Sequence, residues 1–226
     1  MSKPQALCIH VKTLSQLLED SGLTIPTNVV ISLTAGEATA FLANLNKLVY
    51  ELWYIPRSHC ETDNTFRQLL PYVVVTNHKN NLVGYNRPTK KGGEGRLAGK
   101  FSIGIGGHVE PIDHNPTPVS LLHWAAIREL QEELDAEGVS DENPWEVVGL
   151  RLIGLIISDD SPVDSVHLGL VYKTQWFSLL DRPYALESNE PDQICNLRTL
   201  TLEQAGIEPN PESWTAKILA SGMLEG

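Results

Sequence analysis

The chain has 226 residues, of which 42% are hydrophobic, and its formal net charge is −11. This length suits one large domain, or one domain with a small addition. The acidic balance argues against binding along a nucleic-acid backbone, although a nucleotide can still bind where a metal ion offsets the negative charge. We therefore expect no nucleic-acid polymer among the partners of this protein.

The cysteines and the lengths of the apolar runs indicate the cellular compartment of the protein. Cys8, Cys60 and Cys195 are odd in number and widely spaced, which favours reduced thiols over a disulfide framework or a zinc site. The N-terminus has no basic segment followed by a continuous apolar run, and no apolar run approaches the length of a membrane span. We expect a cytoplasmic protein with no signal peptide and no membrane partner.

The first elements are short. We expect a strand over 9–11, a helix over 14–20 and a strand over 29–33. A longer helix is predicted over 34–53, because apolar residues recur there at helical spacing. These residues are Phe41, Leu42, Leu45, Leu48, Val49 and Leu52. We interpret their periodicity as packing rather than as a binding site.

A β-hairpin is predicted next, followed by a basic loop. Residues 68–76 are apolar and β-branched, residues 77–81 have the composition of a turn, and residues 82–86 form the returning strand. Residues 87–100 are rich in glycine and contain five basic residues. Such a loop cannot pack a core, and its charge contrasts with that of the whole chain.

A strand over 101–105 leads into a loop and then into a helix predicted over 117–135. Thr117 suits the N-cap position and Pro118 suits the first turn. An apolar stripe at i+4 spacing marks the side of this helix that should be buried. The stripe consists of Leu122, Ala126, Leu130 and Leu134.

The last third of the chain alternates strands with helices, which together with the earlier elements indicates an α/β fold. The expected elements are strands over 145–158 and 166–176, a turn over 159–162, a mostly irregular segment over 179–192, and helices over 202–205 and 213–219.

The acidic face of the helix over 117–135 is the main candidate site. Glu129, Glu132 and Glu133 stand at i, i+3 and i+4, so their carboxylates share one face and repel one another. A hard divalent cation prefers oxygen ligands and would relieve this repulsion, so we expect Mg²⁺ or Mn²⁺ there, held against a phosphate. The alternative is an ordinary solvated face. Arg128 can hold Glu132 in place, as a simple helix salt bridge would also do.

The basic loop over 87–100 is a second candidate. Arg87, Lys91 and Arg96 would meet substrate phosphates, and the glycines between them would let the backbone approach. The alternative is a loop whose charges only keep it in solution.

Residues 107–133 resemble the signature of the Nudix, or MutT-like, family. Gly107 stands at the opening glycine of that signature, and residues 128–133 (Arg-Glu-Leu-Gln-Glu-Glu) match its second half without a substitution. Asp113 stands six positions after Gly107, where the family has glutamate. Fourteen residues separate Asp113 from Arg128, seven more than the signature has.

The similarity covers about residues 54–220 and one branch of the family, described as predicted phosphoesterases of MutT type. The segments RLAGKFSIGIGGHVE and ISDDSPVDSVHLGLVY and the late ESW carry it. It implies a Nudix-type α/β/α sandwich around a mixed sheet for residues 54–226, with residues 1–53 as an N-terminal addition. That addition packs either on its own domain or on a partner, as in a homodimer.

The resemblance also implies roles for single residues. The carbonyl of Gly107 would add a metal ligand to the three glutamates. Some family members take a general base from a later loop, where Asp159, Asp160 and Asp164 are candidates here, and of these we take Asp160. The alternative for these aspartates is ordinary turn chemistry.

The implied function is that of a Mg²⁺-dependent hydrolase acting on a small phosphorylated molecule. It would cleave a phosphoanhydride bond in a nucleoside diphosphate linked to another moiety, as in a nucleotide sugar, a dinucleotide or an NTP. A Nudix-fold sensor that binds a nucleotide without cleaving it is the alternative. Isomerisation of a diphosphate, as in isopentenyl diphosphate isomerase, is disfavoured because no cysteine lies near the strand over 101–105.

Overall fold

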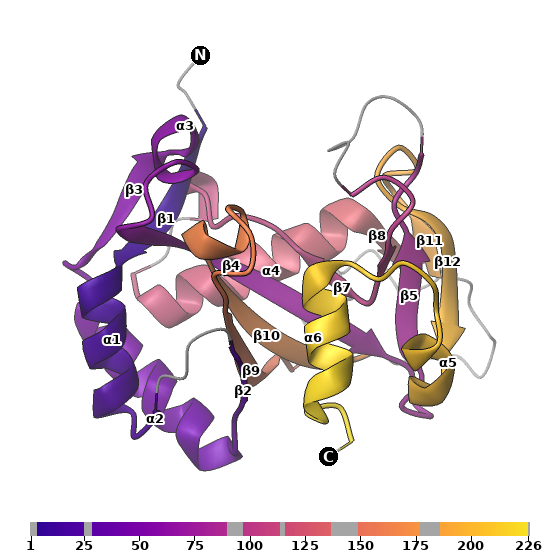
Figure 1. The fold of residues 1–226 in the computed structure, drawn as a ribbon, viewed down its shortest axis with the longest axis horizontal. Helices are drawn as coiled ribbons and strands as arrows, with labels where there is room; N and C mark the ends of the chain where they lie inside the picture. The colour runs from indigo at the N-terminus through magenta and orange to yellow at the C-terminus, as the bar shows by residue number, and fades with distance from the viewer. Residues whose placement is uncertain are drawn as a thin grey trace. The chain divides into compact units, whose positions relative to one another are not determined.

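The computed structural model describes residues 4–24, 29–89, 97–113, 116–136, 149–176 and 186–225 (Figure 1). The chain divides into two compact units. The first comprises Met1–Tyr72, Gly106–Ala126 and Leu152–Tyr172, and the second comprises Val73–Ile105, Ile127–Arg151 and Lys173–Gly226. Among the described helices, none has the length and apolar character required to cross a bilayer.

The N-terminal elements belong to the first unit. They are β1 (Gln5–His10), α1 (Val11–Asp20), β2 (Val29–Ser32), α2 (Ala35–Leu45), the 3-10 turn η1 (Asn46–Leu48), β3 (Leu52–Pro56) and α3 (Arg57–Cys60). The helix predicted over 34–53 was wrong at its end, because α2 stops at Leu45. Of the apolar residues that extended the predicted pattern, Leu48 lies in η1 and Leu52 lies in β3, which pairs antiparallel with β1 and places Trp53 opposite Cys8. α3 was not predicted.

The start of α2 follows from its sequence. The Thr34 hydroxyl accepts a hydrogen bond from the Glu37 N–H, and the Glu37 carboxylate accepts one from the Thr34 N–H. This reciprocal capping box satisfies two backbone donors that the first helical turn would otherwise leave without partners.

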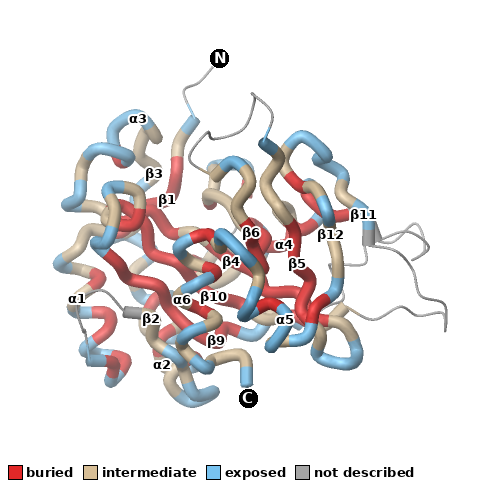
Figure 2. The backbone as a smooth tube through the Cα atoms, turned by 45° about the vertical axis from the view of Figure 1, so that its right-hand side comes forward, coloured by how far each residue is buried: buried red, intermediate tan, exposed pale blue. Residues whose placement is uncertain are grey.

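β4 (Phe66–Thr76) and β5 (Leu82–Asn86) form the predicted hairpin, with Thr76 opposite Leu82. The Asn77 N–H donates to the Asn81 carbonyl at 2.9 Å, which closes the turn. Asn80 has a φ of 60°, a left-handed conformation that asparagine tolerates better than most residues. β4 is buried along most of its length (Figure 2).

The strand predicted over 101–105 is two short strands, β6 (Phe101–Ser102) and β7 (Gly104–Gly106), which pair with β5 and β4 respectively. In the first unit, Gly106 passes very close to the backbone of β4. A Cβ atom added at Gly106 would lie 2.1 Å from the Pro71 carbonyl oxygen and 3.1 Å from the Tyr72 Cα. Only glycine fits this approach. The 3-10 turn η2 (Pro111–Asp113) follows.

The predicted acidic helix is α4 (Pro118–Glu133). Its N-cap is confirmed, since the Thr117 hydroxyl accepts from the Ser120 N–H at 3.2 Å. The predicted stripe is also confirmed, because its members Leu122, Ala126, Leu130 and Leu134 are all at most 1% exposed. The predicted end at residue 135 was wrong: the helix stops at Glu133, and β8 (Leu134–Ala136) begins at once.

A partner strand much later in the chain explains this early stop. β8 pairs antiparallel with β11 (Leu186–Ser188), in a segment that was expected to be mostly irregular. The Asn189 N–H donates to the Glu133 carbonyl at 3.1 Å, and the Asn189 side-chain amide donates to the Gln131 carbonyl at 2.9 Å. These bonds satisfy carbonyl groups that a helix end leaves without partners.

The remaining elements are β9 (Arg151–Ile157), the 3-10 turn η3 (Asp164–Val166), β10 (His167–Gln175), β12 (Cys195–Leu200), α5 (Leu202–Gly206) and α6 (Ser213–Ser221). They match the predicted strands and helices, except that η3 and β12 were not predicted. Residues 145–148 of the strand expected over 145–158 lie outside the described residues.

One large sheet contains most of the strands, in the order β12-β5-β4-β10-β9-β2, with β1, β3, β6 and β7 attached to this path. The predicted α/β class is therefore confirmed, with a large mixed sheet accompanied by helices. Most residues of the central strands β4 and β10 are buried, including polar ones such as Gln68 and Thr174 (Figure 2).

Candidate functional site

The C-terminal turn of α4 gathers four charged side chains. Arg128 Nη1 donates to Glu129 Oε1 at 2.8 Å and to Glu132 Oε2 at 3.0 Å. The Glu132 side chain is 50% exposed and that of Glu129 is 13% exposed. The predicted contact between Arg128 and Glu132 is therefore present, and Arg128 holds Glu129 as well.

Glu133 differs from the other two glutamates because its side chain is buried. The residue is 8% exposed, and its Oε2 atom has no hydrogen-bond partner among the described residues. Burial raises the pKa of Glu133 to about 8. The positive charge of Arg87 opposes this increase, whereas the negative charges of Glu129, Glu190 and Glu212 add to it. A further positive charge beside Glu133 would therefore be strongly favourable.

Arg87, which was predicted to bind substrate, lies just after β5 and is largely buried. Its Nε atom forms an ion pair with Glu212 Oε1 at 3.0 Å, and its guanidinium lies over the Tyr85 ring at 5.1 Å from the ring centroid. Burial alone would lower the pKa of Arg87, but Tyr85, Glu212 and Glu133 raise it above its ordinary value. Arg87 is therefore a permanent cation beside Glu133.

Lys91 and Arg96, the other two predicted substrate-binding residues, lie outside the described residues. Their role stays a prediction.

The donor set of α4 fits a hard divalent cation. Carboxylate oxygens are the ligands that Mg²⁺ and Mn²⁺ prefer, and the buried Glu133 Oε2 atom lacks the partner that a buried oxygen requires. Within the described parts of the chain, no three His, Cys, Asp or Glu side chains are already drawn together as a metal-binding group.

Gly107 and Asp113 lie in the first unit, on the loop that begins the Nudix-like signature. Asp113 is 7% exposed, and its Oδ2 atom accepts a hydrogen bond from the Glu110 N–H at 2.8 Å. The Asp113 N–H donates in turn to the Glu110 carbonyl at 3.0 Å. Asp113 therefore stabilises the turn η2. The carbonyl of Gly107 as a metal ligand stays a prediction.

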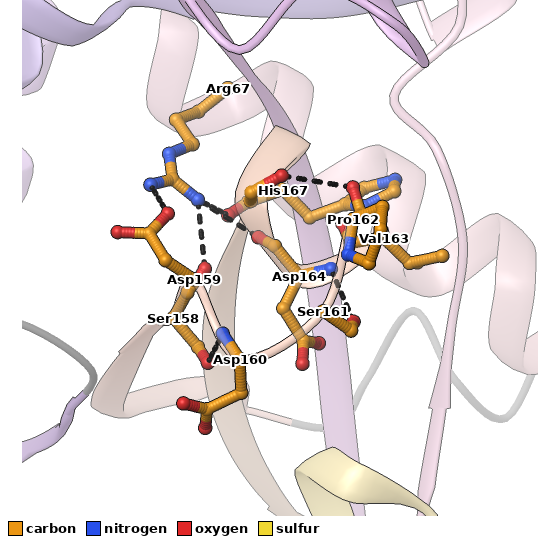
Figure 3. A network of polar contacts seen from close by, with 10 residues as sticks. Arg67, Ser158, Asp159, Asp160, Ser161, Pro162, Val163, Asp164 and His167 are labelled. Atoms are coloured by element: carbon orange, nitrogen blue, oxygen red, sulfur yellow. Dashed lines mark hydrogen bonds and ion pairs between the residues drawn. The ribbon is translucent and has the colours of Figure 1, made fainter.

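The connection between β9 and β10 is organised by Arg67 of β4, a residue that the sequence analysis did not single out (Figure 3). The guanidinium is largely buried and meets three backbone carbonyls and one carboxylate. The contacts are with Ser158 O at 3.0 Å, Asp164 O at 2.8 Å, His167 O at 3.5 Å and Asp159 Oδ1 at 2.6 Å. The sequence signal for this role was a charged residue within a mostly apolar strand.

The three aspartates considered as general bases thus have different surroundings. Asp159 pairs with Arg67, and Asp164 is buried within the same network. Asp160 is exposed, and in Figure 3 its carboxylate points away from Arg67. Asp160 belongs to the first unit and the α4 glutamates to the second, so its catalytic role stays a prediction.

His167 at the start of β10 gives this network a dependence on pH. Burial lowers the pKa of His167, although its Nδ1 contact with the Val163 carbonyl at 2.6 Å and the charge of Asp164 oppose this effect. The folded protein therefore keeps a neutral imidazole at a pH where the unfolded chain, with an ordinary value near 6.5, binds a proton. Stability should be complete above that value and should decline as the pH falls from it towards the lowered folded-state pKa.

We expect the free energy of unfolding to fall across this window, with a slope of at most about 1.4 kcal/mol per pH unit from one group. His167→Asn, which retains an N–H donor near the Val163 carbonyl, should show a smaller slope in urea denaturation at several pH values. The exposed control His78→Asn should keep the slope of the unmodified protein. Equal slopes for all three proteins would contradict the assignment.

No protein-family model matches the chain. A search of curated proteins finds YmaB of Bacillus subtilis (strain 168), which is 32% identical over 161 residues, covering 70% of this chain and 72% of YmaB. The chain belongs to the YmaB family. This degree of identity over most of both chains shows a shared fold, but the name YmaB describes no activity.

Among solved structures, this YmaB relative matches the crystal structure of Tm1382, a proposed Nudix hydrolase. The two are 22% identical with a TM-score of 0.67, and the match covers 98% of this chain and 100% of Tm1382. The Nudix resemblance drawn from residues 107–133 is therefore confirmed at the level of the fold. Both the α/β class and the large mixed sheet agree with it.

Proposed function

We propose that this protein is a Mg²⁺- or Mn²⁺-dependent Nudix hydrolase. Its substrate would be a nucleoside diphosphate linked to another moiety, in which it cleaves a phosphoanhydride bond. The observation that carries the proposal is the buried carboxylate of Glu133, whose Oε2 atom has no hydrogen-bond partner among the described residues. It stands next to Glu129 and Glu132 in a chain with the Nudix fold.

The proposed metal ligands come from α4 and from the loop that precedes it. Glu129, Glu132 and Glu133 would hold the cation, together with the carbonyl of Gly107. A bound divalent cation polarises a phosphoryl group and favours the ionised form of an attacking water.

The chain itself supplies the other functions. Arg128 orients the carboxylates of Glu129 and Glu132 through its two hydrogen bonds. Arg87, whose pKa is raised, would offer a permanent positive charge to the substrate diphosphate. Asp160 would accept the proton of the attacking water on its carboxylate.

A sensor that binds a nucleotide without cleaving it is the second candidate. One observation favours it: the position of the signature glutamate is occupied by Asp113, which is buried and bonded to the Glu110 N–H. A carboxylate committed to a turn is a poor replacement for a residue that acts in catalysis.

Turnover separates the two candidates. The protein is incubated with Mg²⁺ and a panel of nucleotide sugars, dinucleotides and NTPs, and phosphate-containing products are measured. We expect hydrolysis of at least one compound, loss of it with EDTA, and a large decrease with Glu132→Gln but not with the exposed control Glu19→Gln. Activity that survives both EDTA and Glu132→Gln would contradict the metal assignment, and tight binding without turnover would favour the sensor.

Three other expectations stay predictions. They concern a cytoplasmic location, a homodimer, and the division into residues 1–53 and 54–226.

A further inference from the structure

We propose that Glu212 is a positioning residue for the diphosphate-binding part of this site. It fixes the guanidinium of Arg87 beside Glu133, so that the outer nitrogens of Arg87 are presented to a diphosphate group. This inference rests on the function proposed above, and it assigns a role to the ESW segment over 212–214.

The position of Glu212 is fixed by the backbone on both sides. Its N–H donates to the Phe101 carbonyl at 2.8 Å, and its carbonyl accepts from the Ala216 N–H at 2.9 Å in the first turn of α6. The residue is only 7% exposed. Its carboxylate is thus held against the end of β5 by a rigid connection between β6 and α6.

Helix capping does not explain the glutamate at this position. Glu212 is the N-cap residue of α6, but its side chain makes no capping hydrogen bond. The preferred N-cap residues are serine, threonine, aspartate and asparagine, whose short side chains reach the first-turn N–H groups. The Glu212 carboxylate instead accepts from Arg87 Nε at 3.0 Å. The longer side chain therefore serves the ion pair rather than the helix.

Both the backbone and the side chain of Arg87 are held by contacts. Its N–H donates to the Lys100 carbonyl at 2.8 Å, and its carbonyl accepts from the Gly99 N–H at 2.9 Å. Its guanidinium lies over the ring of Tyr85, which is fully buried. Because Glu212 engages the inner nitrogen Nε, the two outer nitrogens keep the forked geometry that suits bidentate contact with a phosphate.

The negative charges around Arg87 explain why its guanidinium needs to be oriented by Glu212. Glu129, Glu133, Glu190 and Glu212 all contribute negative charge around Arg87 or its neighbour Glu133. A mobile arginine would turn towards whichever carboxylate lies nearest and would be unavailable to a ligand. Because Glu212 binds Nε, the Arg87 side chain is already ordered in the free protein. Binding a diphosphate would therefore cost less side-chain conformational entropy.

The test uses two probes, Mn²⁺ alone and then imidodiphosphate in the presence of Mn²⁺, both measured by calorimetry on the full chain. Imidodiphosphate has a P–N–P linkage that resists hydrolysis. For Glu212→Gln we expect Mn²⁺ affinity within about twofold of the unmodified protein, and imidodiphosphate affinity reduced about tenfold or more, as for loss of a hydrogen bond to a charged group. Arg87→Lys should show the same pattern.

The double variant Glu212→Gln/Arg87→Lys should bind imidodiphosphate no more weakly than Arg87→Lys alone, because both changes remove one function. Glu212→Asp, which keeps the charge, should recover part of the affinity, and it also serves if Glu212→Gln fails to fold. The matched control is Glu208→Gln, which breaks the Arg198–Glu208 ion pair of 2.8 Å in the same unit and should leave both affinities unchanged.

The outcomes separate the two proposals. If the unmodified protein binds no Mn²⁺, the proposed function fails and this inference fails with it. If the unmodified protein binds both probes and Glu212→Gln binds them equally well, the positioning role is overturned and the proposed function stands. Parallel loss of Mn²⁺ and imidodiphosphate binding in Glu212→Gln would also overturn it, because the residue would then support the site only structurally.

Discussion

Glu133→Gln should reduce kcat of the metal-dependent hydrolysis by about two to three orders of magnitude, the cost typical of losing one preorganised electrostatic contact in a reaction centre. The amide has nearly the same shape as the carboxylate but no negative charge for a cation. Because Glu133 is 8% exposed and its Oε2 atom has no partner among the described residues, burying this carboxyl group is unfavourable for the folded protein, as its raised pKa of about 8 also indicates.

The same substitution should therefore not destabilise the metal-free protein, and its Tm should stay equal or rise. This opposite response of activity and stability distinguishes a functional carboxylate from a structural one. The measurements are kcat on the best substrate of the panel and Tm in EDTA, with the exposed Glu203→Gln as the control. Full activity of Glu133→Gln would refute the role, and so would a large fall in Tm.

Gly106→Ala should lower the free energy of unfolding by about 3 kcal/mol, at the upper end of what overpacking usually costs. The added methyl group would lie 2.1 Å from the Pro71 carbonyl oxygen, a backbone atom of β4 that cannot turn aside as a flexible side chain would. Relief requires β7 to move away from β4, which would break pairing between two strands of the main sheet.

Urea denaturation measures this change, and Gly206→Ala is a matched control. Gly206 ends α5 and has no heavy atom within 4 Å of an added Cβ, so alanine there should be neutral or slightly stabilising. A Gly106→Ala protein whose stability lies within about 0.5 kcal/mol of the unmodified chain, the usual range for harmless surface changes, would contradict the packing argument.

Local sequence signals predicted those parts of the fold that depend on local contacts. The β4–β5 hairpin and the start of α4 are examples, since a turn sequence and a Thr-Pro pair act within a few residues. The ends of α2 and α4 were missed because distant pairing decides them. β3 forms because β1 is available as a partner, and β8 forms because β11 returns to it. Helical periodicity contains no information about such partners.

The same distinction holds for the candidate site. The contact of Arg128 with Glu132 lies within one helical turn and was predicted correctly. The burial of Glu133 and its proximity to Arg87 were not predicted, because they depend on segments far apart in the chain. Glu212 was noted only within the ESW segment that carries the resemblance, and its carboxylate contacts Arg87 instead of the N-terminus of α6.

Arg67 limits how the connection between β9 and β10 can move. Loops ordinarily open at little free-energy cost. Opening residues 158–167, however, would strip the guanidinium of the carbonyl and carboxylate oxygens that surround it, and an unpaired buried cation is expensive. The connection therefore cannot unfold independently while β4 stays in place. We therefore expect strand and loop to open together, so that the exposed Asp160 lies on a connection anchored to β4.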